Sequence, residues 1–278
     1  MSILTSVRSW PVVAVSAVTT TLTLATSVSA ATFSTVYSFL ELTNFSQSPT
    51  TTLTNTETDT LVISSGGSAV AFSDALAIFD ISESLVFNEI ESFTGGIGLD
   101  YIGLAESNAS VLGIFDIDTD EIFSFDISGA LLLATSIENA RVESAFAFGG
   151  LGLALVGSTT SQPPTLLDEL NLLAALETPG EDNIETNLFQ LLLAGNQDNI
   201  IIQSLNVDQD FGSLEEVIAL NFRATYARQF NEPTQVYLLD LKTGKAGVQA
   251  VPAPSSLLGL LAYGLLGLVK RHRSHGLN

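Results

Sequence analysis

Short segments in which apolar and polar residues alternate recur along the middle of this chain and constrain its fold more than any other feature. Three of them share a pattern of Phe, Asp and Ile, namely Ile78–Ser82, Ile114–Asp118 and Ser124–Ser128. In each, Phe and the following Ile fall on one side of an extended chain while Asp falls on the other, as in a half-buried strand. Clusters of Gly, Asn, Asp and Pro separate such segments, as turns separate strands. The pattern predicts a mainly β fold, and we expect a jelly-roll-like β-sandwich.

Acidic residues gather between the second and third of these segments. The polar run from Asp118 to Glu121 predicts a hairpin turn between the flanking strands. Asp116, Asp118 and Asp120 also begin like the D-x-D-x-D of a calcium loop. An EF-hand is excluded, because Glu121 stands where it needs Gly and Ile127 where it needs a bidentate Glu. Two interpretations remain: a looser calcium site formed by Asp116, Asp118, Asp120 and Glu121, or a solvated acidic hairpin.

The sequence pattern of residues 165–194 fits a helix and a strand equally well. Thr165 and Asp168 resemble a capping box, and leucines follow at helical spacing. Leu-rich strands on either side of a turn at Pro179 fit the same residues. We therefore expect one or two short helices or a pair of strands here. Ser213 with Glu216 leaves the same choice open for the next segment.

The composition of residues 31–250 excludes several classes of function. This part holds all thirty acidic residues of the chain and only five of the nine basic ones, a formal net charge of −25. Such a charge opposes binding to nucleic acid or to an anionic membrane surface. The chain has no Cys, and its two histidines, His272 and His275, lie near the C-terminus. Disulfides, thiolate chemistry, a Ser-His-Asp triad and His-ligated zinc are therefore excluded, and we expect no enzymatic activity.

The first thirty residues have the pattern of a secretory signal peptide. Arg8 is their only charge, an apolar and threonine-rich stretch runs from 12 to 25, and Val28-Ser29-Ala30 places small residues at a cleavage site after Ala30. An uncleaved anchor is the alternative. The signal implies the secretion translocon and signal peptidase as partners.

The C-terminal 28 residues combine a proline motif, an apolar run and a basic end. The run Leu257 to Val269 is uncharged, and as a helix it would span about 20 Å, less than the ~30 Å of a bilayer core. Counted from Val251 the span is about 28 Å, which can just cross. The basic residues behind it would remain on the cytoplasmic side. The segment therefore predicts a single transmembrane or sorting helix.

This order of elements resembles the PEP-CTERM sorting signal of Gram-negative bacteria and cyanobacteria. The motif is supplied by Val251, Pro252, Ala253 and Pro254, with Ala in place of the usual Glu, and the basic stop by Lys270, Arg271 and Arg273. The resemblance implies cleavage near the motif by an exosortase-type enzyme, delivery to the cell surface or extracellular space, and association with exopolysaccharide. An ordinary C-terminal membrane anchor is the alternative.

These observations predict four parts: a signal peptide (1–30), a secreted acidic β-sandwich (31–241), a linker (242–250) and a sorting signal with transmembrane helix and basic tail (251–278). We expect a non-enzymatic surface or extracellular-matrix protein with no cofactor other than the hypothetical calcium. One alternative is a carbohydrate-binding or adhesive module, for which the available aromatic residues are Tyr101, Phe146, Phe148, Tyr226 and Tyr237. A second, less favoured alternative is a secreted glycoside hydrolase with paired carboxylates.

Overall fold

The computed structural model describes residues 32–179, 188–195, 199–212 and 214–250, so the predicted signal peptide and sorting tail lie outside the described residues. Every regular element within these ranges is a β-strand. The strands are β1 (Thr32–Thr43), β2 (Thr51–Asp80), β3 (Leu85–Ile117), β4 (Ile122–Ile137), β5 (Glu143–Ser158), β6 (Thr165–Thr178), β7 (Leu188–Gly195), β8 (Ile200–Phe211), β9 (Glu215–Gln229) and β10 (Thr234–Ala250). The predicted mainly β fold is confirmed. No helix in the described ranges is long and apolar enough to cross a membrane.

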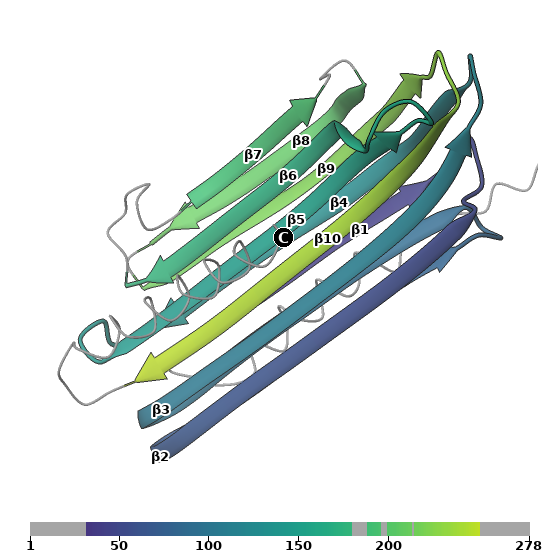
Figure 1. Ribbon diagram of the computed structural model, residues 1–278. Coiled ribbons are helices and arrows are strands. Elements are labelled where there is room, and N and C mark those ends of the chain that lie inside the picture. Colours follow the sequence, from purple (N-terminus) through teal and green to yellow (C-terminus); the bar gives the residue numbers. More distant parts are fainter. Residues whose placement is uncertain (1–31, 180–187, 196–198, 213, 251–278) are drawn as a thin grey trace, which may run out of the picture. The chain divides into compact units, whose positions relative to one another are not determined.

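The ten strands described form one antiparallel sheet. Its order is β7-β6-β5-β10-β3-β1-β4-β9-β8, and β2 pairs with β3. Figure 1 shows β2 and β3 running side by side as the longest strands. One side of β3 pairs with β2 along nearly its whole length, and its other side pairs first with β1 and then with β10. The long β2–β3 hairpin thus connects two halves of the sheet.

The sheet curls because β3 folds back on itself. The hydroxyls of Ser92 and Ser107, which belong to the same strand, lie 2.7 Å apart. The bend falls between them, where Gly98 and Asp100 have φ values of 94° and 58°. A residue without a Cβ tolerates this left-handed conformation best, which accounts for the glycine at the bend. One half of the sheet then contains β8, β9, β4 and β1, and the other contains β10, β5, β6 and β7.

The core fills the space between the two halves of the sheet. Buried side chains alternate along the strands, as in β5, where Leu151, Leu153 and Leu155 are buried. An aromatic cluster at one end joins Phe45, Phe115, Phe123 and Phe125, with the Phe115 and Phe123 ring centroids 4.7 Å apart. At the other end Tyr101 packs with Val248 and neighbouring apolar residues. The alternation therefore also identified the inward faces of Ile114–Asp118 and Ser124–Ser128. It was wrong for the end of Ile78–Ser82, because β2 ends at Asp80 and Ile81 lies exposed in the turn that follows.

The expected helices within 165–194 are wrong for the described part of this segment, which forms β6 and β7. The buried leucines of β6 are Leu170, Leu172 and Leu176, with Ala174 between them, a period of two. Leucines occupy so many positions here that they satisfy the helical period as well, and pairing with β5 and β7 decides in favour of a strand. The alternative helix beginning near Ser213 is also wrong, because Glu216 belongs to β9.

The hairpin expected around residues 118–121 is wrong as well. Near this turn β3 pairs with β2 and β10, whereas β4 pairs with β1 and β9. The turn therefore carries the chain from one half of the sheet to the other. Local alternation specified both strands correctly, but the partners of a strand are set by residues far away in the sequence.

Residues 242–250 form the second half of β10 and are not the expected linker. They pair with both β3 and β5 as far as Ala250. The small residues that indicated flexibility permit close packing instead: a Cβ on Gly244 would lie 2.9 Å from Cδ1 of Ile90 in the other half of the sheet. Lys242, which indicated a polar linker, is buried.

Candidate functional site

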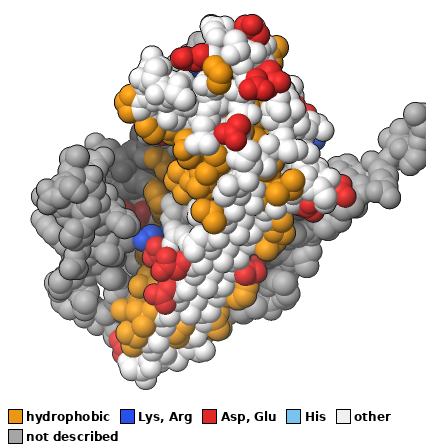
Figure 2. All heavy atoms as spheres, turned by 45° about the vertical axis from the view of Figure 1, so that its right-hand side comes forward, with side chains coloured by type: hydrophobic (Ala, Val, Ile, Leu, Met, Phe, Trp, Pro, Cys, Tyr) orange, Lys and Arg blue, Asp and Glu red, His pale blue; other side chains and the backbone are white. Residues whose placement is uncertain are grey.

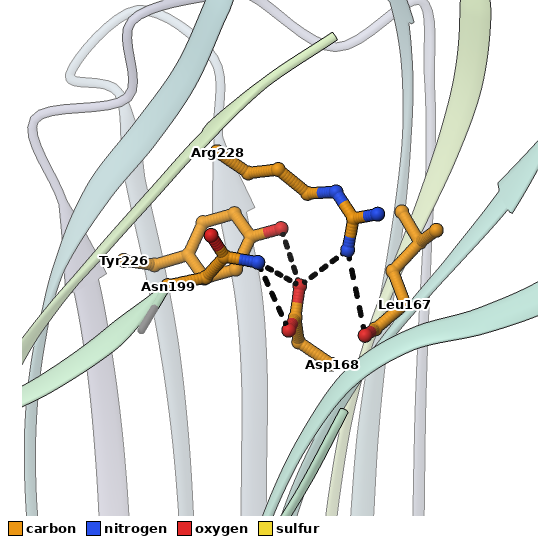
Figure 3. A network of polar contacts seen from close by, with 5 residues as sticks. All are labelled: Leu167, Asp168, Asn199, Tyr226 and Arg228. Atoms are coloured by element: carbon orange, nitrogen blue, oxygen red, sulfur yellow. Dashed lines mark hydrogen bonds and ion pairs between the residues drawn. The ribbon is translucent and has the colours of Figure 1, made fainter. Parts of the chain in front are cut away.

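A buried carboxylate joins the two halves of the curled sheet close to its last strands, β7 and β8 (Figure 3). Asp168 lies on β6, and its side chain is fully buried. Its Oδ2 accepts hydrogen bonds from the hydroxyl of Tyr226 at 3.0 Å and from Nη1 of Arg228 at 3.0 Å, both from β9. Nδ2 of Asn199 lies 3.2 Å from each oxygen of the carboxylate. We call these four residues the Asp168 network.

The surroundings of the Asp168 network are those of a structural contact. Burial raises the pKa of Tyr226, and the negative charge of Asp168 raises it further, so the phenol remains a donor. Arg228 also donates to the carbonyl of Leu167 at 3.4 Å, and its guanidinium lies 5.6 Å from the centroid of the Phe230 ring. The hydrogen bonds from Arg228 are charge-assisted and therefore stronger than neutral ones. The network is suited to holding β6 against β9.

A second buried charged pair lies on β10. Nζ of Lys242 is 2.8 Å from Oδ1 and 3.0 Å from Oδ2 of Asp240, and both side chains are fully buried. The two residues are two apart in a strand, so they point to the same side. Sequence reasoning missed this pair because it assigned Lys242 to a linker. The alternation of β10, in which Val236, Leu238, Asp240 and Lys242 share a parity, is the signal that places both charges inward.

The four residues proposed for calcium have other contacts at the acidic turn. Oδ1 of Asp116 accepts from Gln235 at 3.0 Å. Oε2 of Glu121 accepts from the backbone N–H of Asp118 at 3.2 Å and from Gln47 at 2.9 Å. Asp120 has a positive φ of 65°, and its backbone N–H donates a hydrogen bond to the carbonyl of Phe230, just after β9, at 2.7 Å. Across the described ranges no group of three or more His, Cys, Asp or Glu side chains is arranged to hold a metal ion. The calcium site stays a hypothesis.

The aromatic residues considered for carbohydrate binding do not share one surface. Tyr101 and Tyr226 are both buried in the core. Phe146 and Phe148 are half-buried neighbours on β5. Tyr237 of β10 pairs with Val156, eight residues beyond Phe148 along β5. The motif Val251–Pro254 and the basic stop at Lys270, Arg271 and Arg273 lie outside the described residues.

An acidic cluster that sequence reasoning missed, formed by Asp74, Glu89 and Glu91, lies on the outward side of β2 and β3. Glu91 is paired with Tyr37 on one side and with Asp74 on the other. Burial raises the pKa of Glu91, and the charges of Glu89 and Asp74 raise it further. Burial is also the main reason why the pKa of Glu89 is raised. The spacing of Glu89 and Glu91, two apart in a strand, was the available signal that they share a face.

The described surface carries far more acidic than basic side chains. Figure 2 shows acidic side chains in several separate places on one face of the molecule, with few basic ones among them. Searches against protein-family models, curated proteins and solved structures find no match for this chain. Its function must therefore be argued from its own residues.

Proposed function

We propose that this chain is a non-enzymatic surface or extracellular-matrix protein. In particular, we propose that it is exported as a precursor, sorted through its PEP-CTERM-like C-terminus and associated with exopolysaccharide. The predicted signal peptide and tail support this function. The fold supports it too, because the two halves of the curled antiparallel sheet face each other across a core. This is the arrangement of a β-sandwich. We propose this class, and its jelly-roll-like variant, for the fold.

The observation that carries the proposal is the position of the two ends of the described domain. Thr32, the first residue of β1, pairs with Gly96, and Ala250, the last residue of β10, pairs with Tyr101. Gly96 and Tyr101 flank the bend of β3, so both ends lie at the same pole of the sheet. A domain held by its C-terminus would therefore extend its opposite pole, with the acidic turn at 118–121, away from the membrane.

The proposed sorting motif follows directly after the last paired residue of β10. Ala250 is buried and pairs with both Tyr101 and Glu143, and Val251 begins the motif. Cleavage near Pro254 would release the whole sheet with β10 intact. The sorting enzyme would thus remove a tail without disturbing the fold.

Mass spectrometry of the mature protein from its own cells tests this proposal. We expect an N-terminus at Ala31 and a C-terminus near Pro254. Substitution Pro254→Ala should leave the tail attached, whereas Pro233→Ala, in a turn at the opposite pole, should be processed normally. An intact Asn278 in the mature wild-type protein would overturn the sorting function and indicate a plain membrane anchor.

An adhesive module is the second candidate function, and β2 favours it. Within the described residues β2 pairs only with β3, so the other edge of this 30-residue strand is open. Val70, Phe72, Leu76 and Ile78 on β2 are all large hydrophobic residues that are more than 40% exposed. Open edges and exposed apolar rows are recognised by other chains. Binding between copies that is lost in Phe72→Lys would support adhesion.

Carbohydrate binding and glycoside hydrolysis have weaker support from the described residues than adhesion. The separated positions of Phe148 and Tyr237 give no common stacking surface, which favours the adhesive form of the module. Failure to bind any polysaccharide on a glycan array would exclude carbohydrate binding by the domain alone. Hydrolysis that disappears when one Asp or Glu is substituted would establish an enzyme and contradict our main proposal.

A further inference from the structure

The core between the two halves of the sheet contains polar side chains that the proposed surface function does not explain. Asp240 and Lys242 lie in the middle of β10, and both are fully buried. Lys and Asp are rarely buried unless they are paired. Even a well-made buried ion pair is often no more stabilising than apolar residues of the same volume. The position of this pair therefore points to chemistry rather than to packing.

An asparagine from the other half of the sheet meets this pair. Asn88 belongs to β3 before its bend and is fully buried. Its Nδ2 lies 3.5 Å from the carbonyl oxygen of Ala109, and Ala109 is the residue of β3 that pairs with Lys242. The Asn88 amide is also close enough to Asp240 for a hydrogen bond that lowers the pKa of this carboxyl. Lys, Asp and Asn thus converge at one point of the core.

One polar atom at this point has no hydrogen-bond partner among the described residues. Oδ1 of Asn88 is buried and accepts no hydrogen bond within the described part of the chain. A buried acceptor without a donor is costly. A protonated Asp240 would supply the missing O–H donor, because a neutral carboxyl group both donates and accepts. Rotation of the Asn88 amide would bring Oδ1 to face this donor.

The environment of the pair shifts both groups towards their neutral forms. Burial raises the pKa of Asp240 and lowers the pKa of Lys242 to about 8, and in each case the charge of the partner opposes the shift only in part. A low-dielectric core disfavours both charged forms. Transfer of one proton from Lys242 to Asp240 yields a carboxylic acid and a neutral amine. A desolvated neutral lysine is a nucleophile.

We propose that Lys242 and Asn88 join in an intramolecular isopeptide bond, with Asp240 as the acid–base group. The lone pair of Lys242 Nζ attacks Cγ of Asn88 while the Asp240 carboxyl group donates a hydrogen bond to Oδ1. A proton from Nζ passes through Asp240 to Nδ2. The new Nζ–Cγ bond forms, the Cγ–Nδ2 bond breaks, and ammonia leaves. No oxidant or cofactor is required.

The bond would covalently connect the two halves of the sheet through β3 and β10. It would also replace a buried ion pair with a neutral amide, which removes the cost of a buried charge. The chain has no Cys, so a disulfide cannot serve as the cross-link of an exported domain. A cross-link that closes a long loop stabilises a fold mainly by restricting the unfolded chain. This inference does not depend on the sorting function.

Peptide mapping of the purified full chain tests the proposal. After digestion with trypsin and a Glu-specific protease, we expect the peptide containing Asn88 to be joined to the peptide containing Lys242. The joined mass should equal the sum of the two peptides less one ammonia, and trypsin should not cut after Lys242. Two separate, unmodified peptides from the folded wild-type protein would overturn the proposal, as would a water-loss product linking Lys242 to Asp240.

Variants distinguish the role of each residue. Asp240→Asn keeps the shape of the side chain but removes its acid, and the two peptides should then be recovered unlinked. Lys245→Arg is the matched control, because Lys245 lies on the same strand but pairs with Glu106 at 3.0 Å, and this variant should retain the cross-link. The wild-type measurement decides the proposal even if Asp240→Asn fails to fold. A linked product in a folded Asp240→Asn variant would overturn the role of Asp240.

Discussion

The hydroxyl of Tyr226 lies 3.0 Å from Oδ2 of Asp168, although the two residues belong to strands in different halves of the sheet. Their strands β9 and β6 are next to the last strands, β8 and β7, at opposite ends of the sheet order. The β2–β3 hairpin connects the halves covalently on one side of the core, and the Asp168 network connects them on the other.

Tyr226→Phe removes one donor from the buried carboxylate. We expect the free energy of unfolding to fall by about 1–3 kcal/mol, because Asp168 keeps Arg228 and Asn199 but loses one hydrogen bond to a charged group. Urea denaturation measures the change. Tyr237→Phe is the control, since its hydroxyl donates to Gln235 on the same strand, and we expect a change within about 0.5 kcal/mol. Equal effects of the two substitutions would contradict the bridging role.

Asp168→Ala should be more damaging than the loss of a single donor. It leaves the Arg228 guanidinium and the Tyr226 hydroxyl without their shared acceptor. Breaking a fully buried pair costs about 3–5 kcal/mol, and we expect the lower end of this range because the Arg228 side chain is 28% exposed. The double variant Asp168→Ala, Tyr226→Phe should be less destabilised than the sum of the single changes, because both remove the same contact. Strict additivity in urea denaturation would show that the two groups act independently.

The acidic cluster on β2 and β3 should make stability depend on pH. The pKa of Glu91 is raised above its ordinary value of 4.5 in the folded protein, so folding favours its protonated form. The stability that this group contributes is fully present below pH 4.5 and is lost as the pH rises through the raised pKa. Glu91→Gln also removes the like charge opposite Asp74, and we expect it to stabilise the protein by about 0.2–1 kcal/mol at pH 7.

Urea denaturation at several pH values checks this prediction. The advantage of Glu91→Gln over the wild type should shrink as the pH falls from 7 towards the ordinary pKa of 4.5. Glu57→Gln, at an exposed position of β2, is the control for the loss of one negative charge from an acidic protein. An advantage that does not change with pH, or that Glu57→Gln reproduces, would show that the cluster is not responsible.

Sequence reasoning succeeded for features that are set by neighbouring residues and failed for features that depend on which strands pair. The alternation in Ile114–Asp118 and Ser124–Ser128 placed both segments in strands with the correct buried faces. It could not show that they pair with different neighbours, because pairing depends on β1, β2, β9 and β10. The leucines around Leu170 satisfied two periods at once, and only pairing with β5 and β7 selects one of them.

The candidate sites show the same limit. Asp168 was noticed as one half of a capping box, a local pattern, whereas its real partners Tyr226 and Arg228 lie about 60 residues away. Lys242 was assigned to a linker because Gly and Lys surround it. The parity of β10 indicates that Lys242 points inward, but Asn88 is brought to it only by the bend of β3. Contacts between residues that lie so far apart in the chain produce no recognisable spacing pattern in the sequence.

The bend of β3 provides the last prediction. Gly98 has a φ of 94°, and a Cβ added there would lie 3.0 Å from the backbone of Gly67 on β2. Gly98→Ala should therefore destabilise the protein by about 1–3 kcal/mol, because a left-handed backbone and a tight backbone contact are both strained. Gly95→Ala is the matched control, since a Cβ there would first meet the Phe93 ring at an ordinary 3.4 Å, and its cost should be smaller. Thermal and urea unfolding of both variants measure the difference. If the two substitutions had equal effects, the glycine at 98 would not be what allows β3 to fold back and bring the halves of the sheet together.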